Sequence, residues 1–164
     1  MRIFLLLLLT VFTLSLSAQS RSLERFVDHY RGLETADHLN LGGFIIKAIG
    51  VFSGDADARE VTRRLSHLRV LTIDNGPRLL SPEITGLTEE LRRDKFEDFI
   101  EFREGKEGGR ILIRENKRGI TDLVLLLNGD ENEFILVSLE GLFSFKDLQE
   151  LDIDFNGKDY LSGK

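Results

Sequence analysis

The segment 152–157 near the C-terminus has the pattern most suited to metal chemistry in this chain. It reads Asp-Ile-Asp-Phe-Asn-Gly, which matches positions 1, 3, 5 and 6 of an EF-hand calcium loop. Oxygen ligands at alternate positions can wrap a hard cation, and the glycine makes the turn. The candidate ligands are therefore Asp152, Asp154 and Asn156.

The rest of that loop does not fit calcium. Position 8 is Asp159 where an apolar residue is usual, and position 12 is Gly163 where a bidentate glutamate should stand. We favour a second interpretation, in which Ile153 and Phe155 pack inward before an Asn-Gly turn. The calcium loop is kept as the alternative, and no resident metal or cofactor is expected.

We expect millimolar calcium to leave the melting temperature unchanged, because the twelfth ligand of the loop is missing. A protein saturated a hundredfold above its Kd would gain about 2.7 kcal/mol from the bound ion. Thermal melts with and without calcium measure this directly. A rise of several degrees that Asp152→Ala abolishes would show that the loop binds the ion.

Three histidines, His29, His38 and His67, are the other candidates for metal binding or proton transfer. No two of them have the i, i+4 spacing with which a helix binds zinc. His67 closes an expected helix, where a cation suits the negative end. We interpret all three as solvated, with a site assembled in space as the alternative.

The motifs of common enzyme classes are absent. No Gly-x-Ser-x-Gly segment offers a serine nucleophile in a sharp turn, and 28 acidic residues are too many to single out one glycosidase pair. The pair Gly42-Gly43 precedes a helix, but no lysine follows at the spacing of a phosphate-binding loop. No catalytic and no cofactor-binding residue is therefore assigned.

The elements that would position any site fall into two groups, with helices early in the chain. Leu23, Phe26, Val27 and Tyr30 form an apolar stripe at i, i+3, i+4 and i+7 after a cap at Ser22. We expect further helices over 43–52, from Asp55 or Asp57 onward, from Thr88 to about Lys95, and over 145–151.

From residue 99 the apolar period changes to two, which predicts strands. Turn residues separate these strands, so an antiparallel meander is the simplest topology. The sequence thus predicts an α+β domain with an antiparallel sheet of four to six strands packed against amphipathic helices from the N-terminal half. We expect strands over 36–41, 67–73, 99–103, 110–116, 120–127 and 133–140.

The first 20 residues predict a cleavable signal peptide. Arg2 precedes an apolar run over 3–14, and small residues then provide two junctions for signal peptidase, after Ser17 or after Ser20. A retained membrane anchor is the alternative, but a spanning helix needs about 20 apolar residues and polar positions begin too early here. We therefore expect export to the periplasm or medium, and no transmembrane helix after cleavage.

The composition of the chain excludes several kinds of anchor, cross-link and partner. The chain has no cysteine, so we expect no lipid anchor, disulfide or thiol chemistry. We expect one domain over 21–155, which has the size of a typical domain, followed by a polar tail over 156–164. Arg2 is the only charged residue of the signal, so its removal changes the net charge from −6 to −7. Nucleic acid is then an unfavourable partner, because binding it needs clustered basic residues.

Several segments together resemble a known family. They are the Phe26 to Tyr30 helix, the motif LSHLRVLT at 65–72, and the block DLVLLL at 122–127 that leads to FILVSLEG at 134–141. With the signal peptide before them, they are similar to domain-of-unknown-function family 4252 of exported bacterial proteins. The resemblance implies export and a single small domain. It implies no activity, so no catalytic residue is carried over.

Two neighbouring strands are apolar on both faces, which suggests an interaction surface. A sheet with one wet face would alternate apolar and polar residues, whereas every residue over 123–127 is apolar. The helix over 43–52 covers the second face in the favoured interpretation. In the alternative, the face without helices is an exposed patch that binds a partner, and we assign Val124 and Leu126 to it.

These observations predict an exported bacterial envelope protein that acts as a non-catalytic binding or structural module. Its expected partner is another envelope protein or a second copy. The alternative is a small exported enzyme or a metal-dependent module whose site is dispersed in the sequence. A concave cavity where histidines or carboxylates meet would favour the enzyme, and an exposed apolar face would favour the binding module.

Overall fold

The computed structural model describes residues 20–52, 62–104, 107–129 and 132–144 of the chain. Within these residues an antiparallel sheet of six strands packs against helices. The helices are α2 (Arg21–Tyr30), α3 (Gly43–Phe52) and α5 (Pro82–Arg93), and the strands are β1 (Ala36–Gly42), β2 (Leu65–Ile73), β3 (Glu97–Glu104), β4 (Glu107–Asn116), β5 (Gly119–Asn128) and β6 (Phe134–Phe143).

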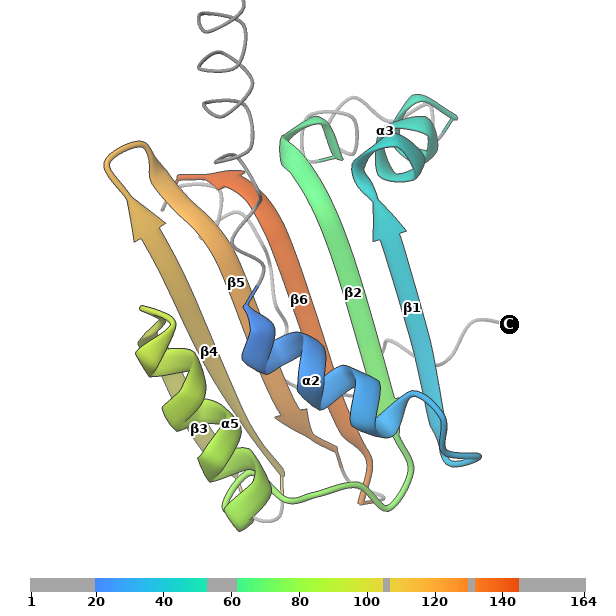
Figure 1. The fold of residues 1–164 in the computed structure, drawn as a ribbon, viewed down its shortest axis with the longest axis vertical. Coiled ribbons are helices and arrows are strands. Elements are labelled where there is room, and N and C mark those ends of the chain that lie inside the picture. Colours follow the sequence, from blue (N-terminus) through green and yellow to red (C-terminus); the bar gives the residue numbers. More distant parts are fainter. Residues whose placement is uncertain (1–19, 53–61, 105–106, 130–131, 145–164) are drawn as a thin grey trace, which may run out of the picture.

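The strand order is β1-β2-β6-β5-β4-β3, and every neighbouring pair is antiparallel (Figure 1). Strands β3 to β6 form the expected meander, which confirms the α+β class and the antiparallel sheet. Strand β2 lies beside β6, although 60 residues or more separate their paired positions in the chain, as with Leu71 and Leu136. None of the described helices has the length and apolarity needed to cross a membrane.

Helix α2 begins two residues earlier than its sequence pattern suggested. Ser20, and not Ser22, is the N-cap, because the Ser20 side chain accepts a hydrogen bond from the backbone N–H of Leu23. The predicted apolar stripe is confirmed, since Leu23, Val27 and Tyr30 are buried and Phe26 is partly buried against the same core. The apolar side of α2 packs against the sheet, while the charged residues of the helix face solvent.

Helix α5 also begins before its predicted start at Thr88. Ser81 caps it by accepting a hydrogen bond from the N–H of Ile84, and Pro82 occupies the first turn, where its missing N–H costs nothing. The expectation that this helix starts at Thr88 was therefore wrong. Thr88 lies inside the helix and its hydroxyl donates to the carbonyl of Ile84.

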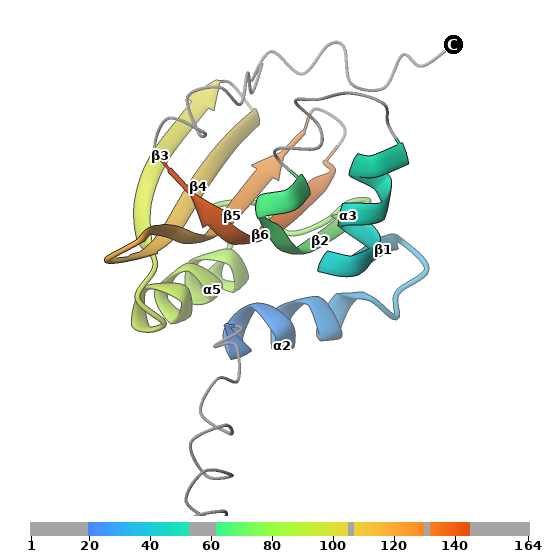
Figure 2. The same ribbon diagram turned by 90° about the horizontal axis from the view of Figure 1, so that it is seen from above.

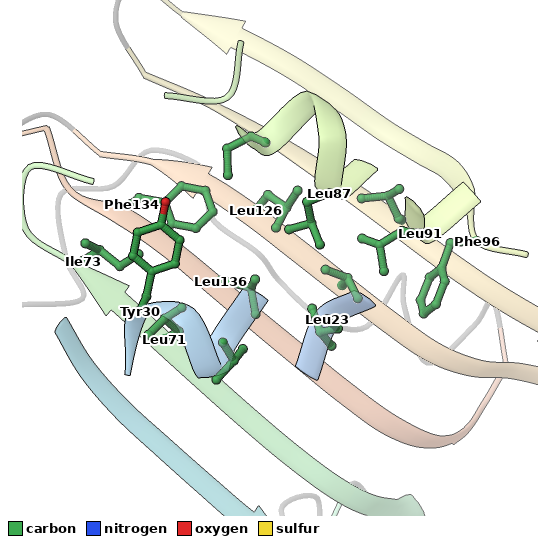
Figure 3. Packing of buried hydrophobic residues seen from close by; sticks show 14 residues of the cluster. Leu23, Tyr30, Leu71, Ile73, Leu87, Leu91, Phe96, Leu126, Phe134 and Leu136 are labelled. Atoms are coloured by element: carbon green, nitrogen blue, oxygen red, sulfur yellow. The ribbon is translucent and has the colours of Figure 1, made fainter. Parts of the chain in front are cut away.

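A first hydrophobic core fills the space between the sheet and helices α2 and α5 (Figure 3). Side chains from both helices meet alternate residues of the central strands, and the phenyl ring of Phe26 lies edge-on to that of Phe134 at 6.0 Å between ring centroids. Its buried members are Leu23, Val27, Tyr30, Leu71, Ile73, Ile84, Leu87, Leu91, Phe96, Leu112, Val124, Leu126, Phe134 and Leu136.

A second core occupies the opposite face of the sheet. Figure 2 shows α2 and α5 on one side, whereas α3 lies at the β1–β2 end, where it contacts both strands. Ile46 of α3 is 3% exposed and belongs to this cluster. Helix α3 therefore covers part of the second face, as one of the two interpretations expected. The buried members are Ile46, Leu65, Ile111, Ile113, Ile120, Leu123 and Phe143.

Several predicted features lie outside the described residues. These are the signal peptide up to residue 19, the helix start at Asp55 or Asp57, the helix over 145–151, and the calcium segment over 152–157. The structure therefore leaves the calcium expectation as a prediction.

Candidate functional site

A row of charged side chains crosses the sheet near the start of α2 and the end of α5. His67 on β2 pairs in register with Glu140 on β6, Glu140 pairs with Asp122 on β5, and Asp122 pairs with Arg114 on β4. Asp122 is two residues from Val124, so the row lies on the same face as the first core. We call these four residues the charged row.

The Arg114–Asp122 pair is the best-ordered part of the charged row. The guanidinium donates from Nε to Oδ2 and from Nη2 to Oδ1, both at 2.8 Å, and the side chains are only 18% and 10% exposed. The hydroxyl of Thr121 donates to Oδ2 at 2.7 Å, and the guanidinium also lies over the ring of Phe96. Both carboxylate oxygens of Asp122 are thus occupied in a bidentate geometry.

The charged row opens into a polar cavity of about 890 Å³. Glu140, Asp122 and Arg114 line it from the sheet, and Ser20 and Asp94 line it from the helix ends. The hydroxyls of Ser20 and Ser22 both donate to Oδ2 of Asp94, at 2.7 and 3.0 Å. This carboxylate therefore joins the start of α2 to the end of α5. Glu140 is the carboxylate of the row that is not held in a bidentate pair.

Burial raises the pKa of Glu140 above the ordinary value of a glutamate. The positive charges of His67, Arg69 and Arg114 oppose this change, and the negative charge of Asp122 adds to it. A carboxyl group with a raised pKa in a cavity is suited to proton transfer. Among the described residues, no group of three His, Asp or Glu side chains is placed to hold a metal ion.

Glu140→Gln is expected to raise the melting temperature near neutral pH. Because the pKa of Glu140 is raised by folding, its stabilising contribution is complete below the ordinary glutamate pKa and is lost as the pH rises through the raised value. Glutamine stays neutral throughout, so the variant avoids that loss. The melting temperatures of variant and wild type should converge at acid pH. A difference between them that is the same at every pH would contradict this.

The three histidines lie on different elements. His29 on α2 is exposed, with its ring edge-on to that of Tyr30. His38 on β1 is also largely exposed. Partial desolvation of its ring, with the charges of Arg69 and Arg31, lowers its pKa, and the charge of Asp28 opposes this change.

His67 differs from the other two histidines. It lies in a strand, as the expected strand over 67–73 required, but it does not close a helix, because β2 already begins at Leu65. It is half-buried, and its Nε2 is hydrogen-bonded to Oδ1 of Asn40. It is the one histidine that joins the charged row.

Sequence reasoning missed the charged row because its members share no motif. Asp122 directly precedes the apolar run of β5, and Glu140 directly follows the apolar run of β6. Each therefore reads as an ordinary polar strand end. The signal that could have found them is the antiparallel pairing of these two strands, which brings the start of one beside the end of the other.

The structure corrects the assignment of Val124 and Leu126 to a face without helices. Both side chains are 0% exposed and belong to the core beneath α2 and α5. The face opposite these helices carries Leu123, Leu125 and Leu127 instead. Any partner that binds the sheet therefore meets the odd-numbered residues of this run.

All six strands contribute apolar side chains to that opposite face, and we call it the open face. Of its outer members, Leu39 on β1 is 47% exposed and Ile100 on β3 is 38% exposed. Ile111, Ile113 and Leu123 on this face are buried in the second core, whereas the other apolar side chains around them are half-buried. These half-buried residues are Leu41, Leu68, Val70, Leu125, Leu127, Ile135, Val137 and Leu139.

Comparison with protein families gives one match. The family described as "Domain of unknown function (DUF4252)" matches residues 30–151, which covers every strand of the sheet. The chain belongs to this family. No curated protein and no solved structure matches the chain. The matched range of this DUF4252 domain contains the charged row and the open face, and the family is an uncharacterised one.

Proposed function

We propose that this DUF4252 domain is an exported bacterial envelope protein that acts as a non-catalytic binding module. Its binding surface is the open face, and its partner is another envelope protein or a second copy. Export rests on the basic residue, apolar run and small residues of the first 20 positions. Binding rests on one observation, the apolar open face, because large apolar patches on soluble proteins mark interaction sites.

The contrast between the two sides of β6 supports this choice. Phe134 and Leu136 on the helix side are fully buried, whereas Ile135 and Val137, which alternate with them, are half-buried. Leu125 on β5 pairs with Val137 in register and is half-buried too. These side chains are apolar and border the second core, against which Leu125 packs, but they stay only half-buried, which suits them to a protein partner.

A photoreactive amino acid at Val137 of the full chain, expressed with its leader, tests the binding surface. We expect ultraviolet light to yield a covalent adduct from the envelope fraction, either with a second copy or with one defined protein. The matched control carries the same residue at Leu80, a position outside the strands that is 63% exposed. Equal labelling from both positions, or none from Val137, would contradict the proposal.

A second experiment separates binding from folding. Leu125→Lys places a charge on the open face where a half-buried side chain can reach solvent. We expect this variant to keep its circular dichroism spectrum and to lose the adduct at Val137. A folded variant with undiminished adduct would show that the open face is not the binding surface.

The charged row is the specific observation that favours the alternative, a small exported enzyme. Glu140 has a raised pKa and lines a polar cavity beside Asp122, which are features of a site for acid–base chemistry. Thermal melts with a panel of small polar compounds test this alternative. A compound that raises the melting temperature of the wild type and not of Glu140→Gln would favour the enzyme over the binding module.

A further inference from the structure

We infer that signal peptidase cleaves this chain after Ser17 and not after Ser20, so that the mature protein begins at Ala18. The inference rests on the proposed export. The sequence alone leaves two junctions of small residues open, after Ser17 and after Ser20, and only cleavage after Ser17 keeps Ser20 in the mature protein.

Ser20 completes the first turn of α2. Its Oγ accepts a hydrogen bond from the N–H of Leu23 at 3.3 Å, and its carbonyl oxygen accepts one from the N–H of Glu24 at 3.1 Å. The first N–H groups of a helix have no partner within the helix, so Ser20 supplies acceptors for two of them. The residue is 6% exposed, which makes these bonds part of the folded interior.

Ser20 also joins two helices. Its hydroxyl donates to Oδ2 of Asp94 at 2.7 Å, and Asp94 is the C-cap of α5. The hydroxyl of Ser22 donates to the same oxygen at 3.0 Å. Hydrogen bonds to a carboxylate are stronger than those between neutral groups. The start of α2 is therefore held to the end of α5 next to Leu23, which is 2% exposed in the first core.

The two junctions leave different ends on the folded domain. Cleavage after Ser20 would make Arg21 the first residue, removing the cap, both acceptors and one donor to Asp94. It would also place an α-ammonium group at the positive end of the helix dipole, where a cation is unfavourable. Cleavage after Ser17 keeps every one of these contacts and places the new charge three positions before the helix.

The test uses the full chain, exported from a bacterial host and purified from the periplasm or medium. N-terminal sequencing and intact mass should identify Ala18 as the first residue. A first residue of Arg21 would overturn the inference and leave the proposed export intact. A protein that retains Met1 in the membrane fraction would instead overturn the export on which the inference rests.

A leader variant tests the physical reason. Ser17→Phe removes the small residue required at the upstream junction and leaves the downstream junction unchanged. We expect the variant either to remain uncleaved or to yield a protein that begins at Arg21 and melts several degrees below the wild type, since the loss of a helix cap lowers stability. Ser15→Ala, which keeps the upstream junction small, is the matched control and should still yield Ala18. An Arg21 protein that melts with the wild type would contradict the role of Ser20.

Discussion

Val124→Lys is expected to unfold the domain. Val124 is 0% exposed in central strand β5 and lies in the core beneath α2 and α5. A lysine there must bury its ammonium group without a partner or distort the packing around it, and either costs several kcal/mol. Domains of this size are stable by about 5–15 kcal/mol in total. Urea unfolding followed by circular dichroism should show the native signal lost or its midpoint greatly lowered.

The adjacent residue gives the control for this prediction. Leu125→Lys carries the same charge on the same strand, but its side chain lies on the open face and is half-buried. We expect it to lower the unfolding midpoint far less than Val124→Lys does. Leu126→Lys, which returns to the helix side at 0% exposure, should again unfold the domain. Equal effects at all three positions would show that the two faces do not differ as described.

Asp122→Ala is expected to reduce the free energy of unfolding by about 3 kcal/mol, because it removes the carboxylate that holds the largely buried Arg114 guanidinium through two charge-assisted hydrogen bonds. The Arg114 side chain is 18% exposed and both of its bonds to Asp122 are 2.8 Å long. Water therefore cannot fully replace the lost carboxylate. Chemical denaturation of the variant against the wild type measures the difference.

Two further variants make this measurement specific. Glu90→Ala removes an exposed partner of Arg25, a pair whose side chains are 42% and 69% exposed, so it should cost less than about 1 kcal/mol. Replacing Arg114 and Asp122 together by leucine should cost less than Asp122→Ala alone, because both buried charges of the pair are then removed and apolar side chains fill their place. A double variant as unstable as the sum of its single variants would count against a direct interaction.

The two proposals about function use opposite sides of the same sheet. The charged row and its cavity lie on the helix side, beside the ends of α2 and α5. The open face lies on the other side, with α3 over its β1–β2 end. Variants of Glu140 and of Val137 can therefore be read independently, because the two side chains point away from each other across β6.

Local patterns determined the elements of this protein. The stripe of Leu23, Val27 and Tyr30 predicted α2, and alternation in the C-terminal half predicted the meander from β3 to β6. Both predictions were possible because helix and strand periodicities depend only on residues that are close in the sequence. Short turns between those strands left few other pairings. The errors at the starts of α2 and α5 arose because several serines and threonines could each have served as the cap.

Only the tertiary structure decided what these elements face. The pattern over 123–127 showed that both sides of β5 are apolar, but a period of two is the same on either side, so it could not say that α2 and α5 cover Val124 and leave Leu125 on the open face. The same holds for the charged row. His67 and Glu140 meet because β2 lies beside β6, a pairing set by the path of the chain through α5 to the far edge of the sheet and not by any local pattern.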